Sequence, residues 1–263
     1  MSRTQAPRAL RALGLACAVG FAFPGLYLIW RNFTSGADPL RLLFTNQTLQ
    51  PLWRTVRLAV LVSVSAACLG TALAWLTTRT DLPFRRLWRV LLPIPLVFPT
   101  FIGAAAFIRT LNPGGVANDF FGSIGINETP ELRGLFGAWL VLTLFCYPYV
   151  YLPVAARLRQ LPGSFEQSAL LLGDTLSQVF RRVVLRQISG SLTAGTLLVF
   201  LYTISDFGAV QLMRYDTLTR AIESNYLARP PMAFALSLIL LAFAGIVVAA
   251  ERSVNRRLPE VAT

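Results

Sequence analysis

The sequence predicts an all-α protein that crosses a membrane six times, folded as one domain over residues 1–263. The chain is 55% hydrophobic, and its apolar residues gather in six long runs that contain hardly any charge. About 20 helical residues cross roughly 30 Å of hydrocarbon, so each run is long enough to be a transmembrane helix. The runs are residues 12–30, 58–76, 90–108, 135–156, 188–205 and 233–250.

The first run follows a short basic tail that contains Arg3, Arg8 and Arg11. A cleaved signal peptide also has a basic tail, but its apolar core is shorter and ends at a small-residue cleavage site. We find no such site here and expect residues 12–30 to remain as the first span. Before the second run, residues 48–60 (TLQPLWRTVRLAV) predict a short separate helix packed against the membrane.

The third run is interrupted by Pro93, Pro95 and Pro99. Proline has no backbone N–H and kinks a helix, so the carbonyls that it frees need other partners. The small residues 103–106 then permit close helix packing. Two interpretations stay open: an irregularly packed helix, or a discontinuous helix whose Pro95 and Pro99 line a pathway.

Arginine alone determines the expected orientation, because the chain has no lysine. With the N-terminus inside, 15 of the 24 arginines lie on the inner side and nine on the outer side. The positive-inside rule therefore places both termini and residues 157–187 in the cytoplasm. The arginines that give the net charge of +12 are distributed by side of the membrane and do not gather in one patch that could face a nucleic-acid groove. We therefore expect no nucleic-acid partner and take the lipid bilayer as the surroundings.

Most catalytic chemistry is disfavoured by composition. The chain has no histidine, which is the commonest general base and metal ligand. Cys17, Cys68 and Cys146 lie singly within apolar runs, lack metal-binding spacing and are expected to be buried. No phosphate-binding GxxxxGK[ST] motif occurs, and we expect no cofactor, no metal site and no catalytic residue.

Residues 164–185 (SFEQSALLLGDTLSQVFRRVVL) form a charged, helix-like segment between two apolar runs. Ser164 with Gln167, and Thr175 with Gln178, have the spacing of capping boxes, and Gly173 separates the two helical halves. One interpretation is an interfacial helix on lipid headgroups, with Arg181 and Arg182 near anionic lipid. A second is a docking helix that fits a groove on another protein.

The spacing resembles a known signature of permease subunits in binding-protein-dependent ABC importers. That signature reads Glu-Ala-Ala, three residues, Gly, nine residues, then Ile-x-Leu-Pro. Here Gln167-Ser168-Ala169 is followed by residues 170–172, Gly173, the nine residues 174–182 and Val183-Val184-Leu185-Arg186. Four positions depart from the pattern, namely Gln167, Ser168, Val183 and Arg186. Glu166 stands one residue before the missing motif carboxylate and is expected to replace it.

The resemblance implies a type I importer permease fold with a cytoplasmic coupling helix and a defined set of partners. These partners are cytoplasmic ATP-binding subunits, a periplasmic substrate-binding protein and a second permease half, supplied by another copy, a separate subunit or a further portion of chain. The coupling segment, Ser164–Gln178, would insert into a groove on the ATPase at the cytoplasmic face of a bacterial inner membrane. Its candidate coupling residues are Ser164, Glu166, Gln167, Ser168, Ala169, Gly173, Asp174, Arg181 and Arg182.

Two stretches, residues 86–104 and 180–226, are most similar to iron(III) importer permeases, and permeases for thiamine, spermidine (a polyamine) and phosphonate share parts of them. The second stretch contains Asp206, Asp216 and Glu223 among tyrosines, a set that suits a hard metal ion. Interleaved arginines favour a solvated or partner-docking surface instead. Asp206, at the outer end of the fifth run, is a candidate outer-gate residue, because a carboxylate there must face protein or water.

We therefore expect an iron(III) importer permease, with another small solute as the alternative cargo. A membrane-embedded enzyme or a scaffold is the alternative from a different class. An intramembrane enzyme needs a histidine, a metal cluster or paired carboxylates within its spans, and the sequence offers none of these.

Overall fold

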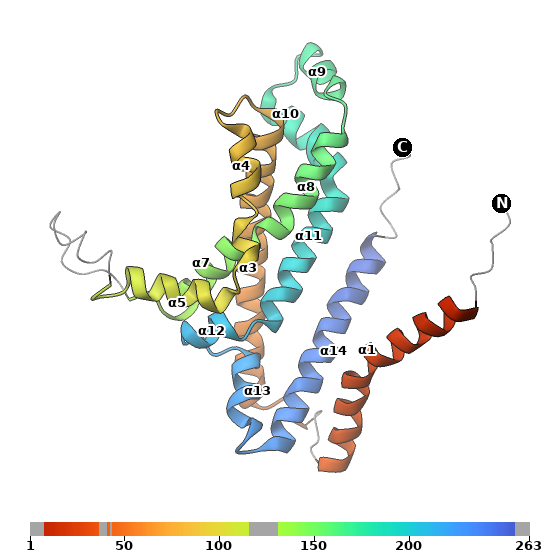
Figure 1. The fold of residues 1–263 in the computed structure, drawn as a ribbon, viewed down its shortest axis with the longest axis vertical. Coiled ribbons are helices and arrows are strands. Elements are labelled where there is room, and N and C mark those ends of the chain that lie inside the picture. Colours follow the sequence, from red (N-terminus) through yellow and green to blue (C-terminus); the bar gives the residue numbers. More distant parts are fainter. Residues whose placement is uncertain (1–7, 37–40, 43, 116–130, 256–263) are drawn as a thin grey trace.

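The computed structural model describes residues 8–36, 41–42, 44–115 and 131–255, and every regular element in this part of the chain is a helix (Figure 1). In chain order the elements are α1 (Arg8–Ser35), α3 (Asn46–Arg79), α4 (Arg85–Leu91), the 3-10 turn η1 (Ile94–Val97), α5 (Thr100–Leu111), α7 (Gly134–Cys146), α8 (Pro148–Gln160), α9 (Ser164–Leu171), α10 (Leu176–Val179), the π-helical turn η2 (Phe180–Val184), α11 (Leu185–Ser205), α12 (Gly208–Leu212), α13 (Leu218–Tyr226) and α14 (Pro230–Asn255).

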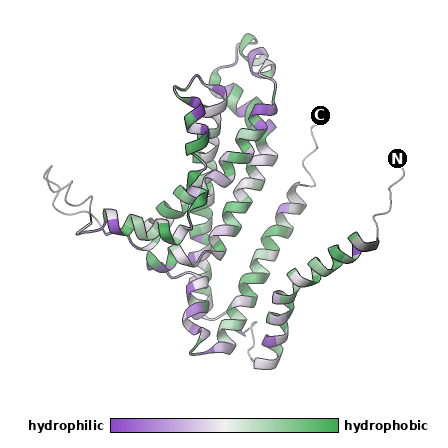
Figure 2. Cartoon of the chain, viewed as in Figure 1, coloured by the Kyte–Doolittle hydropathy of each residue, from purple (hydrophilic) through white to green (hydrophobic). Residues whose placement is uncertain are grey.

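The predicted all-α membrane architecture is confirmed. Among the described residues, five helical stretches are long and apolar enough to cross a membrane, or six if the bent pair around Pro99 counts as one span. Apolar residues run along the long helices, and hydrophilic residues are frequent near α9, α10 and α13 (Figure 2). Residues 116–130, which belong to a connection predicted on the outer side, lie outside the described residues. Arg3, Arg256 and Arg257, which were counted for the predicted orientation, also lie outside them.

The second span corrects one expectation. The short helix predicted at residues 48–60 is not separate, because α3 continues unbroken for 34 residues with Pro51 inside it. Pro51 removes one backbone donor near the start of the helix. Burial of Leu58, Val62 and Ala66 farther along stabilises the continuous helix.

The third span is discontinuous, which confirms the helix break in the second interpretation of its prolines, while the pathway role of Pro95 and Pro99 stays a prediction. Residues 85–97 and α5 meet at an angle of 99° around Phe98 and Pro99. The Leu92 carbonyl, next to Pro93, accepts a hydrogen bond of 2.8 Å from the Tyr147 hydroxyl. Tyr147, between α7 and α8, thus supplies a partner to a carbonyl in the proline-containing half of this span.

The helices α3, α8 and α11 form the centre of the molecule (Figure 1). Gly70 of α3 and Gly195 of α11 both lie against the backbone around Val150 of α8. A Cβ at Gly70 would come within 2.8 Å of the Tyr147 carbonyl oxygen, and one at Gly195 within 2.9 Å of the Tyr149 carbonyl oxygen. Small residues at these two positions let the three backbones approach closely.

At the edge of the bundle, α1 lies beside α14 (Figure 1). Asn32 of α1 donates a 3.0 Å hydrogen bond to the Phe234 carbonyl, and Arg31 stacks over the Phe234 ring at 5.4 Å. Cys146 is buried in the core as expected, but the same expectation is wrong for Cys17 and Cys68. Both are exposed, because they lie on helix faces that no other described element covers.

Candidate functional site

The glycine break in the segment between α8 and α11 is a specific turn. Gly173 has φ +92°, its N–H donates to the Leu170 carbonyl at 3.0 Å, and the Asp174 N–H donates to the Ala169 carbonyl at 3.1 Å. These two bonds are the Schellman pattern, which ends a helix with a residue in the left-handed region. Glycine adopts that region without steric cost, so the sequence sets both the end of α9 and the reversal after it.

The capping box predicted at Ser164 is wrong. Gly163 is the N-cap of α9, Ser164 is the first helical residue, and the Gln167 N–H donates to the Gly163 carbonyl at 3.1 Å. Gly163 has αR dihedral angles, so the helical path starts one residue earlier than the pattern suggested.

The second predicted cap is present and leads into the fifth span. The Thr175 N–H donates to Gln178 Oε1 at 2.7 Å in a capping box that starts α10. The helix then continues through the π-helical turn η2 into α11, so the spanning helix begins at Leu176 rather than at residue 188. Arg181 and Arg182 lie on this turn, and Arg182 forms an ion pair of 3.2 Å with Asp174.

The most exposed part of this segment is apolar. Leu171 and Leu172 are 89% and 88% exposed, Leu176 is 72% exposed and Phe165 is 54% exposed. We call these four residues the apolar tip. α9 lies at one end of the bundle, beyond the end of α3 (Figure 1), so the tip stands away from the packed spans.

Glu166 faces the protein rather than solvent. Its Oε1 lies 3.0 Å from Arg79 Nε at the end of α3, and both side chains are more than four-fifths buried. Arg79 Nη2 also donates to the Leu161 carbonyl at 2.9 Å. Gln167 and Ser168 are exposed, whereas Ala169 is buried. The sequence motif gave no indication that Arg79 belongs to this site.

At the start of α12, Asp206 bonds several elements together. It is 8% exposed, its Oδ1 accepts a 2.7 Å hydrogen bond from the Thr100 hydroxyl, and its Oδ2 accepts the Ala209 and Val210 N–H groups at 3.0 and 3.3 Å. Asp206 thus faces protein, as its position required, and fixes the start of α12 against the start of α5.

A hollow of about 180 Å³ adjoins this contact at the break in the third span. Its walls include both predicted pathway residues, Pro95 and Pro99, together with Tyr149 and Tyr202. The Tyr202 and Thr100 hydroxyl oxygens are 3.2 Å apart. Thr100 has one hydroxyl hydrogen, which it donates to Asp206, so Tyr202 must donate to Thr100 and keeps its oxygen lone pairs as acceptors.

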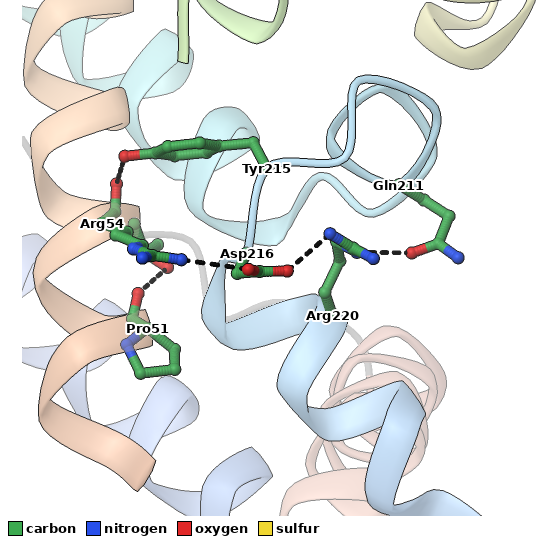
Figure 3. A network of polar contacts seen from close by, with 7 residues as sticks. Pro51, Arg54, Gln211, Tyr215, Asp216 and Arg220 are labelled. Atoms are coloured by element: carbon green, nitrogen blue, oxygen red, sulfur yellow. Dashed lines mark hydrogen bonds and ion pairs between the residues drawn. The ribbon is translucent and has the colours of Figure 1, made fainter. Parts of the chain in front are cut away.

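The segment after Asp206 is bound to α3 by a charged network (Figure 3). Asp216 forms ion pairs with Arg54 at 3.0 Å and Arg220 at 2.6 Å, and Arg220 also donates to Gln211. The Tyr215 hydroxyl donates to the Arg54 carbonyl at 3.3 Å. Burial raises the pKa of Tyr215 while Arg57 and Arg54 oppose that rise, and the net upward shift keeps the phenol protonated as a donor.

The metal-like residue set suggested by the sequence is not assembled among the described residues. Asp206 is engaged by Thr100 and two backbone N–H groups, and Asp216 is engaged by two arginines. This mixed-charge arrangement corresponds to the surface interpretation of the segment.

A family profile described as "Binding-protein-dependent transport system inner membrane component" matches residues 59–259. The chain is 30% identical over 218 residues to the "Fe(3+)-transport system permease protein FbpB 2" of Haemophilus influenzae, covering 82% of this chain and 40% of that protein. It is also 30% identical over 167 residues to the "Sulfate transport system permease protein CysT" of Salmonella typhimurium, covering 63% and 59%. The chain thus spans less than two thirds of these two relatives.

A probable molybdenum ABC transporter permease of Haloferax volcanii is 28% identical over 189 residues, with 71% of this chain and 68% of that protein covered. Among solved structures, a bacterial ABC transporter involved in alginate import matches with a TM-score of 0.76 at 18% identity, covering 96% of each chain. The MetNI methionine ABC transporter matches with a TM-score of 0.60 at 15% identity, covering 85% of this chain and 100% of that chain. These two likenesses show the fold alone.

Proposed function

Because the chain belongs to the family of binding-protein-dependent transport system inner membrane components, we propose that it is one permease half of an ABC importer. In this proposal the spans form half of a translocation pathway and the chain itself hydrolyses nothing. The observation that carries the proposal is the apolar tip, which the fold presents on a fixed turn beyond the end of α3.

The tip has the properties of a docking surface for a cytoplasmic ATPase. Four large apolar side chains are exposed around Gly173, and polar residues such as Gln167 and Ser168 are exposed next to them. Exposed apolar groups with a polar rim mark protein or membrane interaction sites. The Schellman turn and the Arg79 contact hold the tip at a defined angle, which insertion into a protein groove needs and lipid contact does not.

The arginine distribution supports a cytoplasmic position for the tip and for both termini. With that orientation α13 and the Asp216 network face the periplasm, where a substrate-binding protein would dock. The alignment covers 40% of the Haemophilus relative, which supports a requirement for a second half, from another copy, a separate subunit or further chain.

For the cargo we propose iron(III). The relatives include permeases named for iron, sulfate and molybdenum, so similarity alone leaves both a cation and oxyanions as possible cargo. None of the described residues that line the hollow at the third-span break is an arginine. The hollow presents the Tyr202 oxygen as an acceptor, and the Asp206 carboxylate supports this arrangement through Thr100. An oxyanion needs donors or positive charge, whereas a hard cation prefers oxygen ligands.

The decisive experiment is cargo-dependent ATPase stimulation in proteoliposomes that contain this chain, its partner half, the ATPase and the periplasmic binding protein. We expect stimulation by iron(III)-loaded binding protein, but not by the empty protein or by a sulfate- or thiamine-loaded protein. Stimulation by a sulfate-loaded protein would contradict the cargo proposal and leave the importer proposal intact.

The docking role has its own test. Leu171→Ser with Leu172→Ser should abolish copurification of the ATPase, because it removes the most exposed apolar groups of the tip. Leu227→Ser is the matched control, since Leu227 is 88% exposed at the opposite end of the molecule, after α13. Full ATPase recovery with the double variant would contradict docking through the tip.

A further inference from the structure

The two ends of α3 are tied to different parts of the molecule. At the inner end, Arg79 is the last residue of the helix, and its guanidinium contacts both the Glu166 carboxylate and the Leu161 carbonyl. The carboxylate lies within α9 and the carbonyl precedes it, so one side chain fixes the base of α9 to α3. Because both charged side chains are largely buried, this pair is screened less than a surface ion pair.

At the outer end, α3 is tied to the segment that contains α12 and α13. The Leu218 N–H, at the start of α13, donates to Thr55 Oγ1 at 2.8 Å, and both residues are almost completely buried. The Tyr215 hydroxyl and the Asp216 carboxylate contact Arg54 one residue earlier (Figure 3). The exposed ion pair between Arg54 and Asp216 adds little stability. The buried hydrogen bond from the Leu218 N–H to Thr55 Oγ1 is costly to lose.

Between these ties, α3 is unbroken. At about 1.5 Å per residue, its 34 residues form a rod of about 51 Å. Pro51 precedes both ties, so no proline lies between Thr55 and Arg79, and Gly70, the one glycine there, is packed closely against the start of α8. By contrast, among the described spans the third is bent by 99° and the fifth contains a π-helical turn.

From this arrangement we propose that α3 is a rigid rod that transmits movement between α9 and the α12–α13 segment, with Arg79 and Thr55 as its positioning residues. The inference rests on the proposed importer function, because that function requires loading of the outer side to be sensed at the ATPase. Glu166 then connects α9 to the spans and does not replace the missing motif carboxylate at the ATPase surface.

The test uses the full transporter in proteoliposomes and the ratio of ATPase activity with iron(III)-loaded binding protein to activity without it. Coupling between two sites typically amounts to a factor of about 5 to 150. We expect Arg79→Gln and Thr55→Val each to lower the ratio by at least roughly fivefold while the ATPase still copurifies. The exchanged pair Arg79→Glu with Glu166→Arg should restore the ratio, which a general loss of folding would not allow.

Two matched controls separate the ties from general effects. Arg86→Gln removes an exposed arginine on the same side as Arg79, and Thr196→Val removes a hydroxyl that bonds only within its own helix α11. Both should leave the ratio within roughly twofold of the wild type, well inside the range of a broken coupling. A wild-type ratio for Arg79→Gln would overturn the proposal.

A second readout does not depend on transport. In the purified chain, Arg79→Gln should accelerate amide hydrogen exchange across α9, and the exchanged pair should reverse that effect. Unchanged exchange in α9 would contradict the Arg79 tie even if the ATPase ratio fell. If the wild-type chain captures no ATPase, the proposed function fails, and this exchange measurement still decides whether Arg79 positions α9.

Discussion

Gly173 allows a purely conformational test of the turn that presents the apolar tip. Its φ is +92°, and a Cβ added there would meet nothing within 4 Å, so Gly173→Ala introduces backbone strain without a steric clash. An L-residue in the left-handed region costs about 1–2 kcal/mol. That cost should raise the population of the opened turn by a factor of about 5 to 30.

The assay is amide hydrogen exchange of Asp174, whose N–H is bonded to the Ala169 carbonyl only while the turn is formed. Gly173→Ala should accelerate this exchange by about 5- to 30-fold, and Gly173→Asn by less, because asparagine tolerates the left-handed region. Gly163→Ala is the matched control: it lies at the other end of α9, has φ −65° and has equally open surroundings.

Gly173→Pro is the extreme member of the series. Proline fixes φ near −65° and has no N–H to donate to the Leu170 carbonyl, so the turn cannot form. Transport should be abolished while membrane insertion stays normal. Exchange of Asp174 that is unchanged in Gly173→Ala, or normal uptake by Gly173→Pro, would refute the reasoning.

Three further outcomes follow from individual contacts. Gly70→Ala should lower the stability of the detergent-purified chain by about 1–3 kcal/mol, measured by thermal unfolding, because its Cβ would meet α8 at 2.8 Å; Gly190→Ala, with nothing within 4 Å, should not. Asp206→Ala should cost about 1–3 kcal/mol by leaving buried N–H donors unpaired, and unchanged thermal unfolding would contradict its capping role. Glu166→Lys places a second cation beside Arg79 and should uncouple ATP hydrolysis from loaded binding protein; unchanged stimulation would argue against the tie.

Hydropathy was sufficient to predict the membrane helices, because apolar runs of spanning length have few alternatives in a bilayer. The break at Pro99 was foreseen as one of two outcomes, since proline always removes a donor but the degree of bending depends on the partners available. Tyr147, 55 residues from Leu92, supplies such a partner, and no local pattern indicates this pairing.

In the segment that contains α9 and α10, contacts between residues far apart in the sequence were likewise not predictable. Gly173 and the cap at Thr175 were predictable, because both depend on residues within one turn of each other. The role of Glu166 was not predictable, because it depends on Arg79, which is brought near by the packing of α3 against α8. The start of α9 was also missed, since capping patterns locate a helix end only to within one or two residues.

The π-helical turn at Phe180–Val184 has a consequence for the direction in which α9 points. Each residue of an α-helix advances the chain by about 100° around the axis, and a π turn contains one residue more than an α turn. The extra residue therefore sets how far α9 and α10 are rotated about the axis of α11. Deleting one residue within 180–184 would leave one regular α-helix over this stretch and rotate the leucines of the tip about its axis by about 100°. Residue count in this turn, more than residue identity, fixes the direction in which the apolar tip faces.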